Sequence, residues 1–176
     1  MSSDAQRRIV AVVGGSGVTD EAVLAMAFEL GLGIGRLGFH LVCGGGCGVM
    51  EAACRGFRAA GGPGLAIGIL PSARREDCNE WVDISLPTGL GPARNALVAQ
   101  AGHAVVAVDG ESGTLAEIAL AWQYGRPIVA LAASGGWAAE LAGRQIDSRW
   151  PHRVLAAGSV AEALEMLADL LARRPA

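Results

Sequence analysis

The stretch Ile9-Val10-Ala11-Val12-Val13-Gly14-Gly15-Ser16-Gly17 decides the fold. Its first five residues are apolar and mostly β-branched, which is typical of a strand buried on both faces. The glycines that follow allow a tight turn, and Thr19 is a good N-cap for a helix with Asp20 and Glu21 in its first turn. We expect this helix to end near Gly38. The stretch therefore predicts a strand, a glycine loop and a helix in that order.

The same unit recurs along the chain. A second strand, Phe39–Cys43, is followed by the glycine loop 44–48 and by a helix that starts at Val49. We expect further strands at residues 65–70, 81–86, 103–108, 128–131 and 154–155, and helices at residues 93–101 and 114–124 and after Ser159. Apolar strands that alternate with helices predict an α/β fold, a Rossmann-like three-layer sandwich whose mainly parallel sheet has helices on both faces. Right-handed crossovers then bring the strand-to-helix loops to one edge, where ligands bind in such sheets.

Length and composition limit the domain organisation. A chain of 176 residues with 52% apolar and 18% charged residues is expected to form one domain with a sizeable core. We place a single Rossmann-like nucleotide-binding domain at residues 9–174, after a disordered polar tail at residues 1–8.

The charged residues exclude several classes of function. All 14 basic residues are arginines, and 17 acidic residues give a net charge of −3. We therefore expect no nucleic-acid partner, and the lack of lysine excludes Schiff-base chemistry. No apolar run approaches the roughly 18 residues of a membrane span, so no membrane partner is expected either. Four cysteines without a secretory leader favour a cytoplasmic location.

The cysteines do not predict a metal site. Cys43, Cys47, Cys54 and Cys78 lack the paired spacing of zinc ligands. We expect them to be small buried hydrophobic residues and predict no bound metal.

One apparent dinucleotide motif is discarded. Residues 33–38 spell G-x-G-x-x-G, but they follow a helix and precede a strand. The mechanism needs the reverse order, because the glycines must lead from a strand into a helix N-terminus. We interpret the segment as a helix end packed closely against the sheet.

Two glycine loops have the right context for an anion. Each follows a strand and opens a helix, where backbone amides are free to bind a negative group. Tight turns also favour glycine for purely structural reasons, so either loop alone leaves the two interpretations equal. The candidate ligand-binding residues in these loops are Gly14, Gly15, Ser16, Gly44, Gly45, Gly46, Gly48 and Met50.

Two other helix starts carry functional side chains. Thr114 offers a hydroxyl and free amides to a phosphate, and Glu117 one turn later can accept hydrogen bonds from a sugar or polarise a water. Taken alone, Glu117 is better explained as a capping-box glutamate. The preceding helix starts with Arg94 and Asn95. An arginine suits phosphate recognition. The alternative is that Arg94 is a solvent-exposed charge that binds no ligand.

In combination these segments resemble the LOG-like superfamily, which contains LOG proteins and molybdenum-cofactor carrier proteins. The resemblance covers residues 9–132 and rests on four segments in order: Gly44-Gly45-Gly46-x-Gly48-Val49-Met50-Glu51-Ala52-Ala53, Ile67-Gly68-Ile69-Leu70-Pro71, Ala93-Arg94-Asn95 and Gly113-Thr114-Leu115-Ala116-Glu117. It implies a Rossmann-like fold, usually a dimer, with a nucleotide phosphate bound at the strand ends.

The resemblance also implies roles for residues. LOG enzymes hydrolyse the N-glycosidic bond of cytokinin riboside 5′-monophosphates and have the pattern P-G-G-x-G-T-x-x-E with an upstream arginine, matched here by Arg94, Thr114 and Glu117. Arg94 and Glu117 are then the catalytic candidates, since an anionic glutamate can stabilise an oxocarbenium-like transition state. The remaining ligand-binding candidates are Asn95, Gly110, Ser112, Gly113 and Thr114.

Two departures from the LOG pattern affect the functional prediction. Asp109-Gly110-Glu111 replaces P-G-G and puts two carboxylates beside the expected anion. Repulsion between these like charges disfavours binding of the anion. Arg94-Asn95 replaces the common R-K and resembles the carrier branch. We predict a protein that binds a phosphorylated nucleotide-type ligand and hydrolyses nucleoside 5′-monophosphates. The alternative is a non-catalytic molybdenum-cofactor (pterin) carrier or a nucleotide sensor.

We expect the protein to require no cofactor, its ligand being a nucleoside monophosphate or a molybdopterin-type molecule. A mean hydropathy of +0.38 predicts a homodimer or larger assembly, because it leaves more apolar surface than one small sheet hides. The helices that begin near Ala93 and Thr114 are the expected contact surfaces.

Overall fold

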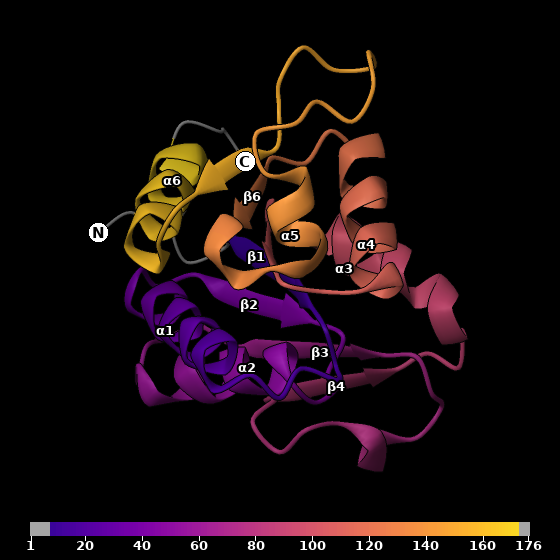
Figure 1. Cartoon of the computed structure of the whole chain (residues 1–176). Helices are drawn as coiled ribbons and strands as arrows, with labels where there is room; N and C mark the ends of the chain where they lie inside the picture. The colour runs from indigo at the N-terminus through magenta and orange to yellow at the C-terminus, as the bar shows by residue number, and fades with distance from the viewer. Residues whose placement is uncertain (1–7, 173–176) are drawn as a thin grey trace.

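The computed structural model describes residues 8–172, which form one seven-stranded, all-parallel sheet (Figure 1). The strand order is β4-β3-β2-β1-β5-β6-β7. The strands are β1 (Ile9–Gly14), β2 (His40–Cys43), β3 (Ala66–Leu70), β4 (Ile84–Pro87), β5 (Ala104–Val108), β6 (Ile128–Leu131) and β7 (Leu155–Ala157). The helices are α1 (Glu21–Arg36), α2 (Val49–Ala59), α3 (Asn95–Ala101), α4 (Ser112–Gln123), α5 (Gly136–Leu141) and α6 (Val160–Ala172).

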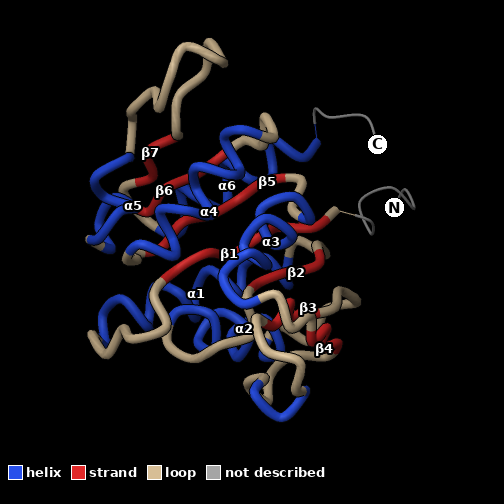
Figure 2. The backbone as a smooth tube through the Cα atoms, turned by 90° about the vertical axis from the view of Figure 1, so that its right-hand side faces the viewer, coloured by secondary structure: helices blue, strands red, loops and turns tan. Residues whose placement is uncertain are grey.

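Helices cover both faces of the sheet, as Figures 1 and 2 show. Alternate residues of β1 enter two different cores: Val10 and Val12 pack with α1, α2 and α6, whereas Ala11 and Val13 pack with α3, α4 and α5. This period of two is what a central strand buried on both sides requires. The predicted Rossmann-like sandwich is therefore confirmed.

The strand order reverses at β1, which lies between β2 and β5. The chain first builds outward from β1 to β4, then returns to β5 on the other side of β1 and builds outward again to β7. In open parallel sheets the loops on either side of such a reversal diverge and leave a crevice at the carboxyl ends of the strands. The loops after β1 and β5 border this crevice.

Several element boundaries differ from prediction. Asp20, not Thr19, caps α1, because its Oδ1 accepts a hydrogen bond from the Ala22 N–H (2.8 Å). β4 lies at Ile84–Pro87 rather than 81–86, and α4 begins at Ser112 rather than at residue 114. α5 was not predicted at all.

The segment 33–38 contacts neighbouring helices through its glycines, and Ile34 within it is buried in the same core as Val10 and Leu41 of the sheet. A Cβ on Gly33 would collide with Leu164 of α6, and a Cβ on Gly35 would lie 2.6 Å from the Cβ of Ala60 at the end of α2. Discarding it as a dinucleotide motif agrees with this packing, and the segment contacts two helices in addition to the sheet that we expected. Its glycines let α1 approach its neighbouring helices closely.

The cysteines are not equally buried. Cys43 and Cys54 are buried, Cys78 is half-buried and Cys47 is exposed, so the prediction of four buried cysteines is wrong for Cys47. Within residues 8–172 no group of three or more metal-ligating side chains is arranged around a common point. In the same part of the chain no helix is both long and apolar enough to cross a membrane.

The ends of the predicted domain are only partly described. Residues 1–7 of the predicted tail, and residues 173 and 174 at the other end, lie outside the described residues. Arg8 is buried, and its carbonyl accepts a hydrogen bond from the His40 N–H (2.8 Å).

Candidate functional site

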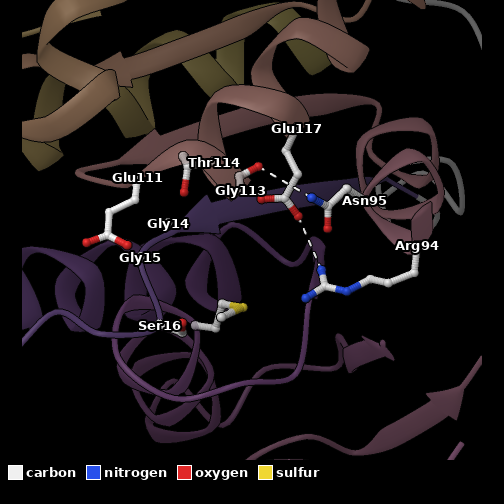
Figure 3. Close-up of a pocket in the computed structure, with 10 residues that line it drawn as sticks. Gly14, Gly15, Ser16, Arg94, Asn95, Glu111, Gly113, Thr114 and Glu117 are labelled. Atoms are coloured by element: carbon white, nitrogen blue, oxygen red, sulfur yellow. Dashed lines mark hydrogen bonds and ion pairs between the residues drawn. The ribbon is translucent and has the colours of Figure 1, made fainter. Parts of the chain in front are cut away.

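A cleft opens at the carboxyl ends of β1 and β5, where the strand order reverses (Figure 3). Its cavity volume is about 120 Å³. The loop after β1, the N-terminus of α2, the start of α3 and the first turns of α4 form its walls. The lining residues are Gly14, Gly15, Ser16, Met50, Arg94, Asn95, Glu111, Gly113, Thr114 and Glu117. The fold thus brings together nine residues assigned to the ligand or to catalysis from the sequence, and adds Glu111.

The other assigned residues shape the walls instead of lining this cleft. Gly48 has a φ of 62°, and a Cβ there would lie 2.5 Å from the Gly15 carbonyl oxygen. The Val49 N–H donates to that same oxygen (3.1 Å), which fastens the loop after β1 to the start of α2. The loop between β2 and α2 also contains Gly44, Gly45 and Gly46, which stand behind the cleft wall. A separate hollow beside α5 is lined by Gly110 and Ser112.

An ion pair between Arg94 and Glu117 lies in the wall of the cleft. Nη1 of Arg94 lies 3.2 Å from Oε1 of Glu117, and the side chains are only 12% and 8% exposed. The guanidinium rests against Gly44, where a Cβ would lie 2.6 Å from the arginine Cζ. Gly44 is therefore the backbone seat of Arg94, meaning the surface against which its guanidinium packs. Any side chain at position 44 would displace the guanidinium.

Arg94 has an unused hydrogen-bond donor. Its Nε is buried and has no hydrogen-bond partner within residues 8–172. A buried polar group without a partner costs free energy, and the great majority of such groups in folded proteins are paired. Arg94, which lines the cleft, therefore has a buried donor that lacks an acceptor.

Burial changes the ionisation of Glu117. Removal from water raises the pKa of Glu117 from 4.5 to about 7, although the nearby charge of Arg94 lowers it. The capping-box interpretation of Glu117 is wrong, because α4 starts at Ser112 and the glutamate lies beyond its first turn and pairs with Arg94. Near neutral pH this carboxyl can therefore either hold or release a proton.

We predict that Glu117 makes the stability of the protein depend on pH. The folded chain retains the Glu117 proton between pH 4.5 and about 7, where an unfolded chain has released it. This contribution to the free energy of unfolding is complete below pH 4.5 and is lost as the pH rises to about 7. Glu117→Gln removes the titration, so its stability relative to wild type should rise over this range by on the order of 3 kcal/mol.

Urea unfolding at several pH values measures this difference. Glu140→Gln is the matched control, because Glu140 also pairs with an arginine but its side chain is 66% exposed. Parallel pH profiles for wild type and Glu117→Gln would contradict the assigned ionisation of Glu117.

The start of α4 forms another wall of the cleft. The first amides of a helix have no partner within it and carry the positive end of the helix dipole. Gly113 and Thr114 belong to this first turn, and among residues 8–172 no atom outside the local helix backbone and the adjacent residues lies within 4 Å of the Cβ position of Gly113. The Asn95 side chain donates to the Gly113 carbonyl (3.4 Å) and links the starts of α3 and α4. Space and backbone donors therefore occur together beside Thr114.

The two carboxylates of the 109–111 loop lie apart from Arg94. In Figure 3 Glu111 and Arg94 lie at opposite ends of the cleft, with Thr114 and Glu117 between them. Asp109 does not line the cleft; it lines a second hollow of about 320 Å³ that shares only Gly15 and Glu111 with the first. The expected conflict between two loop carboxylates and a bound anion is thus reduced to Glu111.

Ser134 fixes the 109–111 loop and was missed from the sequence. Its hydroxyl donates to the Leu131 carbonyl (2.6 Å) and accepts from the Asp109 N–H (2.7 Å). These bonds hold Asp109 in a left-handed conformation with φ of 52°. No local motif marks Ser134, because its role depends on a neighbouring strand.

Comparisons of the sequence and of the fold with known proteins agree with each other. Residues 7–164 match the SLOG cluster4 family. The molybdenum cofactor binding protein of the phototrophic bacterium Rippkaea orientalis is 32% identical with a TM-score of 0.82, covering 94% of this chain and 98% of that one. The molybdenum cofactor carrier protein of Chlamydomonas reinhardtii is 37% identical with a TM-score of 0.80, covering 94% and 99%. The protein TM1055 is 30% identical with a TM-score of 0.85, covering 92% and 99%.

Proposed function

The chain belongs to the SLOG cluster4 family, and from this membership and the chemistry of the cleft we propose that it binds a phosphorylated pterin as a carrier of the molybdenum-cofactor type. Two relatives with closely similar folds are named as molybdenum cofactor binding and carrier proteins. The Arg94-Asn95 pair, which replaces the arginine-lysine pair of LOG enzymes, also favours the carrier over the hydrolase.

The observation that carries the proposal is the unpartnered Nε of Arg94. A phosphate oxygen is a strong acceptor, and charge-assisted bonds from arginine to phosphate are short and strong. The amides at the start of α4, beside Thr114, add donors on the other side of the same cleft. A terminal phosphate group therefore satisfies both sets of donors at once.

The second hollow supports a pterin as the remainder of the ligand. Its polar wall includes Asp109 and Glu111, and neither carboxylate has a hydrogen-bond or ion-pair partner among residues 8–172. The amino group and ring N–H of a pterin are donors that carboxylates accept. Because the two hollows share Gly15 and Glu111, one ligand can place its phosphate in the first and its ring edge in the second.

We expect the purified protein to bind a phosphorylated pterin about a hundredfold more tightly than the same pterin without phosphate. Calorimetric titration measures both affinities, and the fluorescence of any pterin that co-purifies gives an independent check. Equal affinities would exclude the phosphate site. Tight binding of nucleoside monophosphates with no binding of any pterin would exclude the carrier function.

N-glycosidic hydrolysis is the second candidate function, and the environment of Glu117 favours it. Its pKa of about 7 lets the carboxyl ionise near neutral pH, and an ionised carboxylate can stabilise a ribosyl oxocarbenium-like transition state. Incubation with several nucleoside 5′-monophosphates tests it: free base and ribose 5-phosphate are the products. Absence of release from all of them leaves a binding protein only.

We also propose that the protein self-associates through the region of α3. Leu97 on α3 is 39% exposed, and Leu90 just before it is 52% exposed. Burial of such apolar side chains favours association. Light scattering should give at least twice the monomer mass, and Leu97→Asp should lower it; a wild-type protein at monomer mass would contradict this proposal.

A further inference from the structure

Two buried cysteines lie side by side directly behind the cleft. Cys43 is the last residue of β2 and Cys54 lies on α2; their Sγ atoms are 3.6 Å apart and neither side chain is exposed. The Gly45 N–H donates to the Cys43 sulfur (3.3 Å), so the sulfur also anchors the loop that follows β2. The two remaining cysteines are in more exposed positions.

This cysteine pair is mechanically connected to the ligand site. Gly44, between Cys43 and Gly45, is the seat on which the Arg94 guanidinium rests. A shift of the main chain at this point therefore moves the surface under Arg94. The hydrogen bond from Gly45 to Cys43 keeps that surface in place in the thiol state.

We propose that Cys43 and Cys54 are an oxidisable dithiol, and that formation of their disulfide displaces the Gly44–Gly45 segment and weakens anion binding at Arg94. The inference concerns regulation of the cleft and rests on the proposed binding function. A disulfide bond is shorter than the present sulfur separation, so closure draws Cys43 toward α2. The Gly45 N–H then no longer points at the Cys43 sulfur that accepts its hydrogen bond. Gly44, which packs against the Arg94 guanidinium, moves with it.

The oxidation is balanced with a peroxide as the oxidant. The Cys43 thiolate attacks hydrogen peroxide, the O–O bond breaks, and Cys43 sulfenic acid and hydroxide form. The Cys54 thiol then attacks the sulfenic sulfur, the S–O bond breaks, and the disulfide and water are produced. Two electrons leave the pair and reduce one peroxide, and a dithiol reductant reverses the change.

The surroundings of the two sulfur atoms indicate which cysteine attacks the peroxide and which one resolves the sulfenic acid. The hydrogen bond from the Cys54 thiol lowers the pKa of Cys43, and the Gly45 N–H and the charge of Arg94 lower it further, against the effect of burial. The hydrogen bond to Cys43 and burial raise the pKa of Cys54. Because the Gly45 N–H donates a hydrogen bond to the Cys43 sulfur and can stabilise a thiolate there, we assign Cys43 as the nucleophile and Cys54 as the thiol that resolves the sulfenic acid.

The test measures disulfide formation and binding separately. The protein is treated with hydrogen peroxide, unfolded in denaturant, and its free thiols are then alkylated, so that mass spectrometry detects the loss of two hydrogens in the segment containing Cys43 and Cys54. Calorimetry with inorganic phosphate as the probe measures anion affinity before oxidation, after it and after reduction. Cys54→Ala removes the resolving thiol, and Cys47→Ala makes the same change at an exposed cysteine.

We expect wild type and Cys47→Ala to form the disulfide and to lose phosphate affinity by about tenfold or more, with recovery on reduction. Cys54→Ala should keep its own untreated affinity. The inference is overturned if both buried thiols can still be alkylated after peroxide treatment. It is also overturned if the disulfide forms without a change in phosphate affinity.

A failure of the proposed function has a different result. If reduced protein does not bind phosphate, hydrogen exchange at the Gly44–Gly46 amides still tests the switch. Faster exchange in the disulfide form supports the displacement of this segment, whereas unchanged exchange contradicts it.

Discussion

Replacing Arg94 by alanine should weaken the binding of a phosphorylated pterin by about a hundredfold, the loss expected for charge-assisted hydrogen bonds to a phosphate. The substitution removes the buried Nε donor and the positive charge together. It also removes the charge that lowers the pKa of Glu117, so the pKa of this carboxyl should rise further. The neutral carboxyl then remains buried without an ionic partner, and the chain stays folded.

Titration calorimetry of the variant measures the loss. Arg144→Ala is the matched control, because Arg144 also pairs with a glutamate but on the surface, where its side chain is 66% exposed. Arg94→Lys keeps the charge but lacks the fork of the guanidinium, so it should restore only part of the affinity. If Arg94→Ala binds as tightly as Arg144→Ala, then Arg94 does not contact the ligand.

Replacing Gly56 by alanine should lower the free energy of unfolding by about 3 kcal/mol, the upper end of the typical cost of overpacking. A Cβ on Gly56 of α2 would collide with the Phe28 carbonyl of α1, and a Cβ on Gly31 of α1 would collide with the Ala53 carbonyl of α2. The two helices meet at these glycines backbone to backbone. Neither backbone can yield without separating them.

Urea unfolding gives the effect directly. Gly113→Ala is a matched control for stability, since Gly113 is also helical but, in the described part of the chain, no atom beyond its own helix turn lies within 4 Å of its Cβ position. Alanine is the better helix former, so this control should be neutral or more stable by up to about 1 kcal/mol. Equal stability of the Gly56 variant and wild type would show that the two helices do not approach as closely as described.

The architecture could be predicted because its signals are local. The apolar run that begins at Ile9 and the glycines after it identify the central strand and its loop. Parallel strands place all such loops at one edge, so Thr114 and Arg94 could be assigned to a common site without knowledge of any contact. The cleft confirms that these two residues come together.

The roles within the site depended on contacts that no local pattern encodes. The pairing of Glu117 with Arg94 joins two helices, and an error of two residues at the start of α4 made the capping interpretation attractive. Gly44 has the sequence context of an anion-binding loop, but its missing side chain makes room for the Arg94 guanidinium. Ser134 acts only through the Asp109 amide on a neighbouring loop.

A crystal structure of the protein with a bound phosphorylated pterin tests the central claim most directly. We expect the phosphate to accept hydrogen bonds from the Nε of Arg94 and from amides at the start of α4, with the ring edge toward Glu111 and Asp109. A phosphate bound elsewhere on the molecule, with the Arg94 Nε still unpaired, would contradict the account.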